Sequence, residues 1–563
     1  MPLGERNVRR LTGASLVIAT IATRLPFATK MLFEFDSVNF AVATFRFSIA
    51  QVTPHFPGYI LHILFAKFLL LFITDVNQAF VWISILLSVG SVLYLWRAGA
   101  ALRGERVGFI AALIWLFLPI FWFYGLVATA YEYEAFFASA LLYHGMRLLR
   151  TPHNRTHLIT LFVILSLSTA ARQSSLLFFT PAIIVLCMLT KQHLKDITIG
   201  SISFALITAV WLGILFAMCG GASAYWQAML GEHIYRSQSV LFGNPLNEHL
   251  AVIAKVILYL IAATSPFVLI TLFCFLCYRD RLFLLIRESR KKISFYFIIL
   301  VAAVPLLFYL AIYFMKAGYL LNVLPSLTLV TAILIDQLAI WHTFDVKKNP
   351  GNELILTRPI ITKRTAIITV CVVMFNIVWF ILPFPGTSET DFNNGFTRDS
   401  FNEPRGSTVH SQNGFAYFVN RIFSFTSVRC ASTTDRLHEQ VFRILQIEQS
   451  KNNNLVLIDT WWHRWGFYYL PDAVIYDIRD QSSQDTISVG LSRQYSRTMS
   501  LPASIVIPNN AEILLLLRKD HPSFNEISKQ VHLEKIDLPE YLDMWRIADT
   551  SFTLKWKNRI FVK

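Results

Sequence analysis

Long apolar stretches alternate with short polar segments over residues 1–385 of the chain. Roughly twenty consecutive apolar residues let a helix cross the hydrocarbon core of a membrane. Backbone groups inside that core must hydrogen-bond within their own segment, so each stretch is predicted to be an α-helix. The pattern predicts about eleven spans, at residues 8–28, 77–97, 108–126, 134–149, 157–171, 175–190, 197–219, 250–277, 293–314, 319–341 and 365–385.

Composition and charge support a multi-pass membrane protein. Of the 563 residues, 55% are hydrophobic and only 15% are charged, whereas about 25% is usual for a soluble protein. The net charge of +15 comes largely from Lys and Arg clusters between the predicted spans, so it does not indicate nucleic-acid binding. Basic loops stay on the cytoplasmic side. We therefore predict a protein of the inner (plasma) membrane, with a cytoplasmic N-terminus and an extracytoplasmic C-terminal part.

One apolar segment, residues 58–73, does not fit as a span. Counting it would place every later basic loop on the outer side, against the usual charge bias. It begins with a Pro-Gly turn and carries His62 and Lys67. We predict an outer interfacial or re-entrant helix, with His62 and Lys67 at lipid headgroups. Residues 29–76 then form one outer loop.

From about residue 386 the composition changes to polar, turn-rich sequence. Short apolar runs of strand length follow, with a helical pattern at residues 434–449. The predicted strands lie at 455–459, 473–478, 503–507 and 512–517. The fold class is therefore an all-α polytopic membrane domain, residues 1–385, followed by a small extracytoplasmic α/β domain, residues 386–563. The aromatic run TWWHRWGFYYLP, residues 460–471, is consistent with packing or with carbohydrate binding, and packing is favoured.

Six motifs follow one another along residues 1–385. They are FEFDSVNFA (33–41), QVTPHFPGYIL (51–61), PIFWFYGLVATAYEYEAF (119–136), STAARQSSLLFFTP (168–181), YWQAMLGEHIYR (225–236) and KAGYLLNVLPSL (316–327). In this order they resemble GT-C membrane glycosyltransferases of the protein O-mannosyltransferase and lipid A aminoarabinose transferase families. Two departures are that Phe35 separates the two acids of the first motif, and that His55 stands where aminoarabinose transferases have glutamate.

The resemblance implies an enzyme that moves a sugar from a polyprenyl-phosphate carrier to an acceptor hydroxyl on the outer side of the membrane. Asp36 is then the catalytic base, by its place in the first motif. Glu34, His55 and Tyr319 are implied to bind substrate. The alternative for Asp36 is a purely structural role, because Asp36 and Ser37 are good N-cap residues for the helix that follows.

Two basic residues at predicted outer turns, Arg172 and Lys316, run against the positive-inside bias. We predict that they bind the phosphate of the donor, for which the forked guanidinium is well suited. The alternative is snorkelling to lipid headgroups. Glu132 and Glu134, at an outer span end, are consistent with substrate binding or with a plain interfacial position.

A divalent cation is a further prediction, with His55, Glu232 and His233 as candidate oxygen and nitrogen ligands. Two other functions stay open. A transporter or lipid-carrier flippase would require internal repeats and polar residues near the span midplanes, neither of which the sequence shows clearly. A polysaccharide polymerase or ligase of different fold would also have an outer site. The sequence identifies neither the sugar nor the acceptor.

Overall fold

A computed structural model describes most of the chain, and its described residues form two compact units. The helical unit lies within Met1–Ala28, Tyr59–Pro385 and Phe415–Arg429, and the sheet unit within Thr29–Gly58, Gly386–Gly414 and Cys430–Lys563. The described residues are 3–237, 246–290, 292–312, 316–341, 363–382, 427–452, 454–459, 463–477, 487–491, 494–499, 504–518, 523–537, 542–556 and 559–563.

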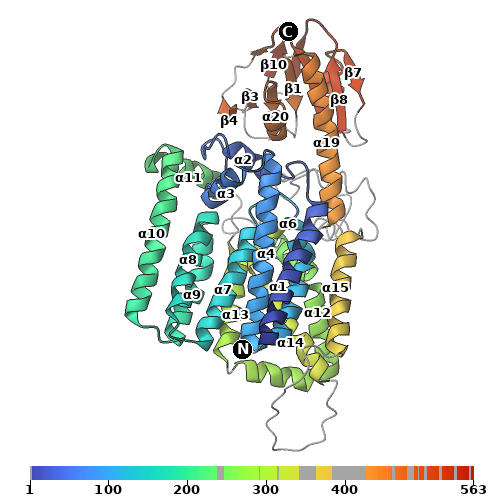
Figure 1. The fold of residues 1–563 in the computed structure, drawn as a ribbon. Helices are drawn as coiled ribbons and strands as arrows, with labels where there is room; N and C mark the ends of the chain where they lie inside the picture. The colour runs from blue at the N-terminus through green and yellow to red at the C-terminus, as the bar shows by residue number, and fades with distance from the viewer. Residues whose placement is uncertain are drawn as a thin grey trace, which may run out of the picture. The chain divides into compact units, whose positions relative to one another are not determined.

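The helical unit consists of α-helices and two short 3-10 turns (Figure 1). Its elements are α1 (Leu3–Arg24), η1 (Leu25–Phe27), α3 (Ile60–Leu69), α4 (Val76–Arg103), α5 (Glu105–Leu116), α6 (Pro119–Tyr124), α7 (Glu132–Arg150), α8 (Arg155–Ala171), α9 (Ser175–Leu189), α10 (Leu194–Cys219), α11 (Ala222–Ser237), α12 (Leu246–Arg290), α13 (Ile293–Ala311), η2 (Ala317–Asn322), α14 (Leu324–Trp341) and α15 (Lys363–Ile381). Helical segments therefore occur at all eleven predicted spans.

Four helices of the described chain, α4, α10, α13 and α15, are long and apolar enough to cross a membrane, and the bent helix α12 would make a fifth. The protein is a multi-pass membrane protein, as predicted. Burial separates two kinds of span: 67% of the most apolar window of α4 is buried but only 11% of that of α10. An apolar helix surface of that size must face lipid, so α4 is central in the bundle and α10 peripheral.

Small polar side chains join the central helices. Ser91 of α4 lies 3.0 Å from the hydroxyl of Ser139 on α7, and the Trp115 indole of α5 donates to Ser91 Oγ at 2.9 Å. Hydrogen bonds between small polar residues are typical of helix packing inside membranes. They fix α4, α5 and α7, which lie side by side, as a rigid centre for the helix ends described below.

Prolines explain where the predicted spans differ from the observed helices. The predicted span 108–126 is two helices, because α5 ends at Leu116 and Pro119 begins α6. Helix α12 bends by 77° next to Pro266, at Thr264, whose backbone is not helical. Helix α3 has ten residues, about 15 Å at 1.5 Å per residue, which is too short to span the bilayer core. The predicted short helix after the Pro-Gly turn is thus observed.

Among its described residues, the sheet unit contains two sheets, helix α2 (Phe35–Ala43) and three further helices, α19 (Val428–Lys451), α20 (His463–Tyr469) and α21 (Ser523–Ile527). The larger sheet has the order β4-β3-β2-β1-β6-β8-β7, with β1 parallel to both β2 and β6, and the smaller has the order β5-β10-β9. The strands are β1 (Leu455–Asp459), β2 (Val474–Asp477), β3 (Ile487–Leu491), β4 (Gln494–Met499), β5 (Ser504–Val506), β6 (Glu512–Arg518), β7 (Leu533–Ile536), β8 (Leu542–Ile547), β9 (Thr553–Trp556) and β10 (Arg559–Val562).

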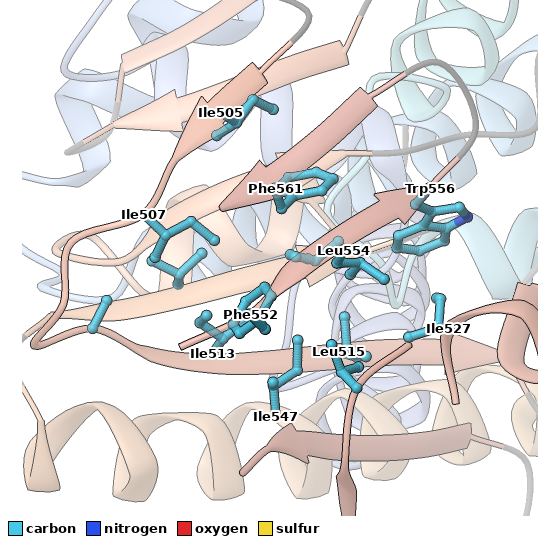
Figure 2. Close-up of a cluster of buried hydrophobic side chains, with 14 of the residues drawn as sticks. Ile505, Ile507, Ile513, Leu515, Ile527, Ile547, Phe552, Leu554, Trp556 and Phe561 are labelled. Atoms are coloured by element: carbon cyan, nitrogen blue, oxygen red, sulfur yellow. The ribbon is translucent and has the colours of Figure 1, made fainter. Parts of the chain in front are cut away.

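Apolar side chains of both sheets and of α21 meet in one core (Figure 2). Strand β6 contributes Ile513, Leu515 and Leu517, and the smaller sheet contributes Leu554, Trp556 and Phe561. On the other face of β6, Leu514 and Leu516 are also buried. A strand buried on both faces reads as a continuous apolar run, which is why EILLLL was recognisable as a strand from sequence.

All four strands predicted in the C-terminal part are confirmed as β1, β2, β5 and β6, and the predicted helix as α19. Strands β3, β4 and β7–β10 were not predicted. Residues 29–58 of the first outer loop group with the C-terminal part, not with the helices. The predicted boundary between residues 385 and 386 lies outside the described residues.

Candidate functional site

Arg172 lies at the centre of a polar group in the helical unit, which we name the arginine cluster (Arg172, Glu134, Tyr309, Tyr319 and Asn322). Arg172 follows the last residue of α8, and its Nη1 donates to Glu134 Oε1 at 3.2 Å. The guanidinium carbon lies 3.9 Å from the centre of the Tyr319 ring. A carboxylate at one side and an aromatic face at the other hold a planar cation in a defined orientation.

The remaining members of the cluster orient Glu134 and the aromatic face. Asn322 Nδ2 donates to Glu134 Oε2 at 3.0 Å and to the Tyr309 hydroxyl at 2.7 Å. The rings of Tyr309 and Tyr319 stack with centroids 5.7 Å apart. Both oxygens of Glu134 therefore have partners. Tyr309 and Asn322 were not predicted, although Asn322 is a polar residue inside an apolar run, which usually marks function in membrane helices.

Lys316 and Tyr319 lie at the same turn. Lys316 is the extended residue before η2, and the Tyr319 N–H donates to its carbonyl at 3.1 Å. Gly318 between them needs its small size: a Cβ there would lie 2.4 Å from the Tyr131 ring. Its N–H donates to the Tyr124 hydroxyl at 3.0 Å. The turn is thus packed closely against α6 and the start of α7.

Arg172 is a permanent cation in these surroundings. Burial works against its charge, but nearby Tyr319 and Glu134 outweigh this effect and raise the pKa of the guanidinium above its usual value. Arginine has five N–H donors, and one of those of Arg172, at Nη1, bonds to Glu134 Oε1. The geometry suits an anion such as phosphate, which binds guanidinium groups through paired hydrogen bonds.

The acids of the first motif lie in the sheet unit, in a segment that we name the acid loop (residues 30–58). Glu34 is the N-cap of α2: its side chain accepts from the Ser37 backbone, while its own N–H donates to Ser37 Oγ at 3.3 Å. The prediction that Asp36 or Ser37 is the N-cap is therefore wrong. Asp36 lies in the first turn of α2, where the helix dipole favours a negative charge.

His55 is brought to Asp36 by a tight turn of the acid loop. Its Nδ1 lies 3.5 Å from Asp36 Oδ1, and its ring lies 5.8 Å from that of Phe40 on α2. The turn closes through Gly58, whose N–H donates to the His55 carbonyl at 3.0 Å. Gly58 has φ +101°, a conformation that favours glycine. The structure thus joins two predicted site residues that are nineteen positions apart in sequence.

Glu132 belongs to a different group within the helical unit. Its carboxylate is fully buried near the Arg24 guanidinium. Arg24 also donates to the Leu116 carbonyl at 2.7 Å, at the end of α5, and lies against the Phe121 ring. These contacts of Arg24 join α1 to α5 and α6, which indicates a structural role.

The described residues do not test the predicted metal site. Helix α11 contains Glu232 and His233, but their side chains lie outside the described part of the chain, as does that of Arg236. Among the described side chains, no group of three acidic, histidine or cysteine residues is placed to bind a metal ion. His55, the third predicted ligand, lies beside Asp36.

Comparison with known proteins identifies the fold. Neither a protein-family model nor a curated protein matches the sequence. Among solved structures, ArnT from Cupriavidus metallidurans in the apo state aligns with a TM-score of 0.56 and 10% identity, over 96% of this chain and 98% of ArnT. The chain has the ArnT fold. The structure of ArnT bound to undecaprenyl phosphate aligns with a TM-score of 0.55 and 11% identity, over 98% and 99% of the two chains.

At the level of the fold, this match confirms the predicted resemblance, since ArnT is a GT-C lipid A aminoarabinose transferase. The alignment runs through the sheet unit as well as the helices, although the C-terminal part of the sequence carried no recognisable motif. The structural alignment establishes the fold. Because only about one residue in ten is identical, the substrate and the acceptor must be argued from this chain's own residues.

Proposed function

We propose that this protein is a membrane glycosyltransferase that moves a sugar from a polyprenyl-phosphate carrier to an acceptor hydroxyl on the outer face of the membrane. The observation that supports this most is the arginine cluster, a cation held between a carboxylate and a tyrosine face, in a chain with the ArnT fold. One of the aligned ArnT structures contains undecaprenyl phosphate, and a polyprenyl phosphate combines the lipid and the anion that such an environment suits.

In the proposed reaction the acceptor oxygen forms a bond to the anomeric carbon as the bond from that carbon to the phosphate oxygen breaks. The carboxylate of Asp36 takes the acceptor's proton, with His55 orienting it. The phosphate leaves with the electron pair, and Arg172 and Lys316 stabilise its negative charge. Tyr319 holds the guanidinium plane, and Glu34 keeps Asp36 in place as the cap of α2. His233 and a divalent cation remain predicted contributors, and no step here depends on them.

The proposed topology has eleven spans, with the N-terminus in the cytoplasm and the sheet unit outside. It is supported by the basic residues between spans, and by ion pairs of such residues: Arg9 with Glu105, and Arg106 with Asp336. These pairs connect α1, α5 and α14 at helix ends whose loops are predicted to face the cytoplasm. Cysteine labelling of single-cysteine variants from either side of sealed vesicles tests this orientation.

The test of function is a transfer assay with purified protein in lipid vesicles. The donors are undecaprenyl-phosphate mannose and undecaprenyl-phosphate aminoarabinose, after the two families that the sequence resembles, and the acceptors are lipid A, peptide and polysaccharide fragments. We expect one donor to lose its sugar to an acceptor, leaving undecaprenyl phosphate. Movement of intact donor across the bilayer without cleavage would instead identify a flippase.

Asp36→Asn is the decisive variant, since the amide cannot accept the proton. A positioned base contributes about 100- to 10,000-fold, and we expect a loss in that range. Asp75→Asn is the matched control: Asp75 is the exposed N-cap of α4, its Oδ1 accepts from the Gln78 N–H at 2.7 Å, and asparagine caps equally well. An Asp36→Asn protein as active as the Asp75→Asn protein would remove Asp36 from the mechanism.

A further inference from the structure

The backbone just before Asp36, the proposed catalytic base, is held by side chains of the C-terminal helices. Three consecutive amides of the acid loop have side-chain acceptors there. The N–H groups of Lys30 and Met31 donate to Asp435 of α19, at 2.8 and 2.6 Å to Oδ1. The Leu32 N–H donates to the Tyr469 hydroxyl of α20 at 3.0 Å.

The Leu32 carbonyl is held from two sides. The Trp465 indole N–H donates to it at 2.8 Å, and His438 Nδ1 lies 3.1 Å from it. Because a carbonyl can only accept, His438 must carry its proton on Nδ1. Burial lowers the pKa of His438 to about 3, although the bond to Leu32 acts in the opposite direction. The ring is therefore neutral at ordinary pH.

A short series of packed residues connects these contacts to Asp36. Phe35, the first residue of α2, meets the Trp465 ring edge-on at 5.8 Å between centroids, and α2 packs along α20. Glu34 caps the same helix, and Asp36 lies in its first turn. Only three residues separate the doubly held Leu32 carbonyl from Asp36.

Together, these contacts fix the backbone of the acid loop closely. A carboxylate that accepts two adjacent backbone amides, together with two ring donors on one carbonyl, defines both the position and the rotation of the backbone. Burial raises the pKa of Asp435, while its bonds from Lys30 and Met31 act against that change. The chain thus keeps a partly buried carboxylate here, and backbone N–H groups of the acid loop donate to it.

We propose that four side chains position Asp36 for catalysis: Asp435, His438, Trp465 and Tyr469. The C-terminal domain then contributes to the transfer reaction by fixing the backbone that carries the base. The proposal rests on the assigned role of Asp36. The proposal also explains the aromatic run of residues 460–471, because its Trp465 and Tyr469 bind the acid loop and not a sugar.

The first test is hydrogen–deuterium exchange on the full-length protein in nanodiscs, with no substrate. Tyr469→Phe removes one hydroxyl and leaves the ring, which packs on Phe442. We expect about fivefold faster exchange in a peptide covering residues 30–36, since one net hydrogen bond is lost. Asp435→Ala should exceed tenfold and also accelerate residues 37–40 of α2, whereas Asp435→Asn, which keeps one acceptor oxygen, should recover part of the protection.

Glu439→Ala is the matched control. Glu439 is an exposed acid one turn further along α19, so its removal should leave exchange of the acid loop unchanged. Exchange in Asp435→Ala equal to that in Glu439→Ala would overturn the proposal. So would faster exchange confined to residues 30–32, because the contacts would then hold the loop without positioning Asp36.

The second test is kinetic, with whichever of undecaprenyl-phosphate mannose or undecaprenyl-phosphate aminoarabinose supports transfer. A positioning role predicts that Asp435→Ala and Tyr469→Phe lower kcat while the donor KM stays within about twofold. An unchanged kcat in both would overturn it. If Asp36→Asn transfers at the wild-type rate, the assigned role of Asp36 fails separately, and the exchange result still decides whether α19 and α20 hold the loop.

Discussion

Arg172 and Asp36, the two side chains with the main assigned roles, are held by different kinds of contact. The guanidinium of Arg172 is held by side chains, the Glu134 carboxylate and the Tyr319 ring, at the ends of packed helices. Asp36 is fixed through its backbone, because the chain before it bonds to Asp435 and Tyr469. The side chain of Arg172 thus depends on neighbouring side chains, whereas the position of Asp36 depends on backbone contacts with segments more than 400 residues away in sequence.

Arg172→Gln should have the largest effect. It removes the charge on which the proposed phosphate site depends, and loss of one such stabilising group typically costs about 100-fold or more in rate. We expect weaker binding of undecaprenyl phosphate and a transfer rate lowered by at least that factor. Arg155→Gln, at the other end of α8 in an exposed pair with Asp196, serves as control and should behave as wild type. Equal activity of the two variants would show that Arg172 does not stabilise the phosphate of the donor.

Gly318→Ala should disturb the arginine cluster from its turn. The new Cβ would lie 2.4 Å from the Tyr131 ring, so the turn before Tyr319 must move. Overpacking of this kind costs about 1–3 kcal/mol, seen as a lower Tm in detergent, with a higher KM for the donor. Gly213→Ala on α10 meets nothing within 4 Å and should stabilise the helix by roughly 0.5–1 kcal/mol. A Gly318→Ala protein with unchanged Tm and KM would show that the close contact is unimportant.

Acid should weaken the contacts that hold the acid loop. The pKa of His438 is lowered to about 3 when the loop is docked, against about 6.5 when it is free. The free state therefore binds more protons between these values, and docking weakens as pH falls below about 6.5, by up to roughly 1.4 kcal/mol per pH unit. The raised pKa of Asp435 has the opposite sign and offsets part of this. The protection of residues 30–36 against amide exchange, relative to the intrinsic exchange rate at each pH, measures this weakening between pH 7 and pH 5.

His438→Gln should flatten this dependence, because glutamine still donates a hydrogen bond but does not titrate. Exchange that responds to pH equally in wild type and in His438→Gln would assign the effect to another group.

Tyr309→Phe should have the smallest effect. It removes the hydroxyl that accepts from Asn322 at 2.7 Å but leaves the bond from Asn322 to Glu134. We expect a loss of about 1 kcal/mol in stability and little change in transfer. Tyr296→Phe, exposed on the same helix α13, should leave Tm unchanged. A collapse of donor binding in Tyr309→Phe would mean that this hydroxyl contacts substrate.

The sequence predicted the elements of the site better than their contacts. Apolar periodicity located the helices, and the charge bias made Arg172 noticeable at an outer turn. Nothing in the pattern shows that Asn322 would bond to Glu134, since the two come from elements 188 residues apart. The proline-broken helices α5 and α6 were merged for the same reason: periodicity describes a face, and hydrogen bonding decides where a helix ends.

The acid loop shows the same limit more strongly. Its acids and His55 were identified as candidates, but their support comes from Asp435 and Tyr469, more than 400 positions away in sequence. Asp435 lies in a helix whose pattern is that of an ordinary amphipathic surface helix. The N-cap of α2 was also misplaced, because Glu34 and Ser37 cap reciprocally and a single-residue preference does not reveal such a pair.

The central claim is that Asp36 acts on a donor already bound through its phosphate. The most direct measurement is single-turnover transfer by Asp36→Asn, loaded with the active undecaprenyl-phosphate sugar, together with the affinity of the same variant for undecaprenyl phosphate. The account predicts that binding is retained while transfer falls by about 100-fold or more. Transfer at the wild-type rate, or a loss fully explained by weaker binding, would contradict it.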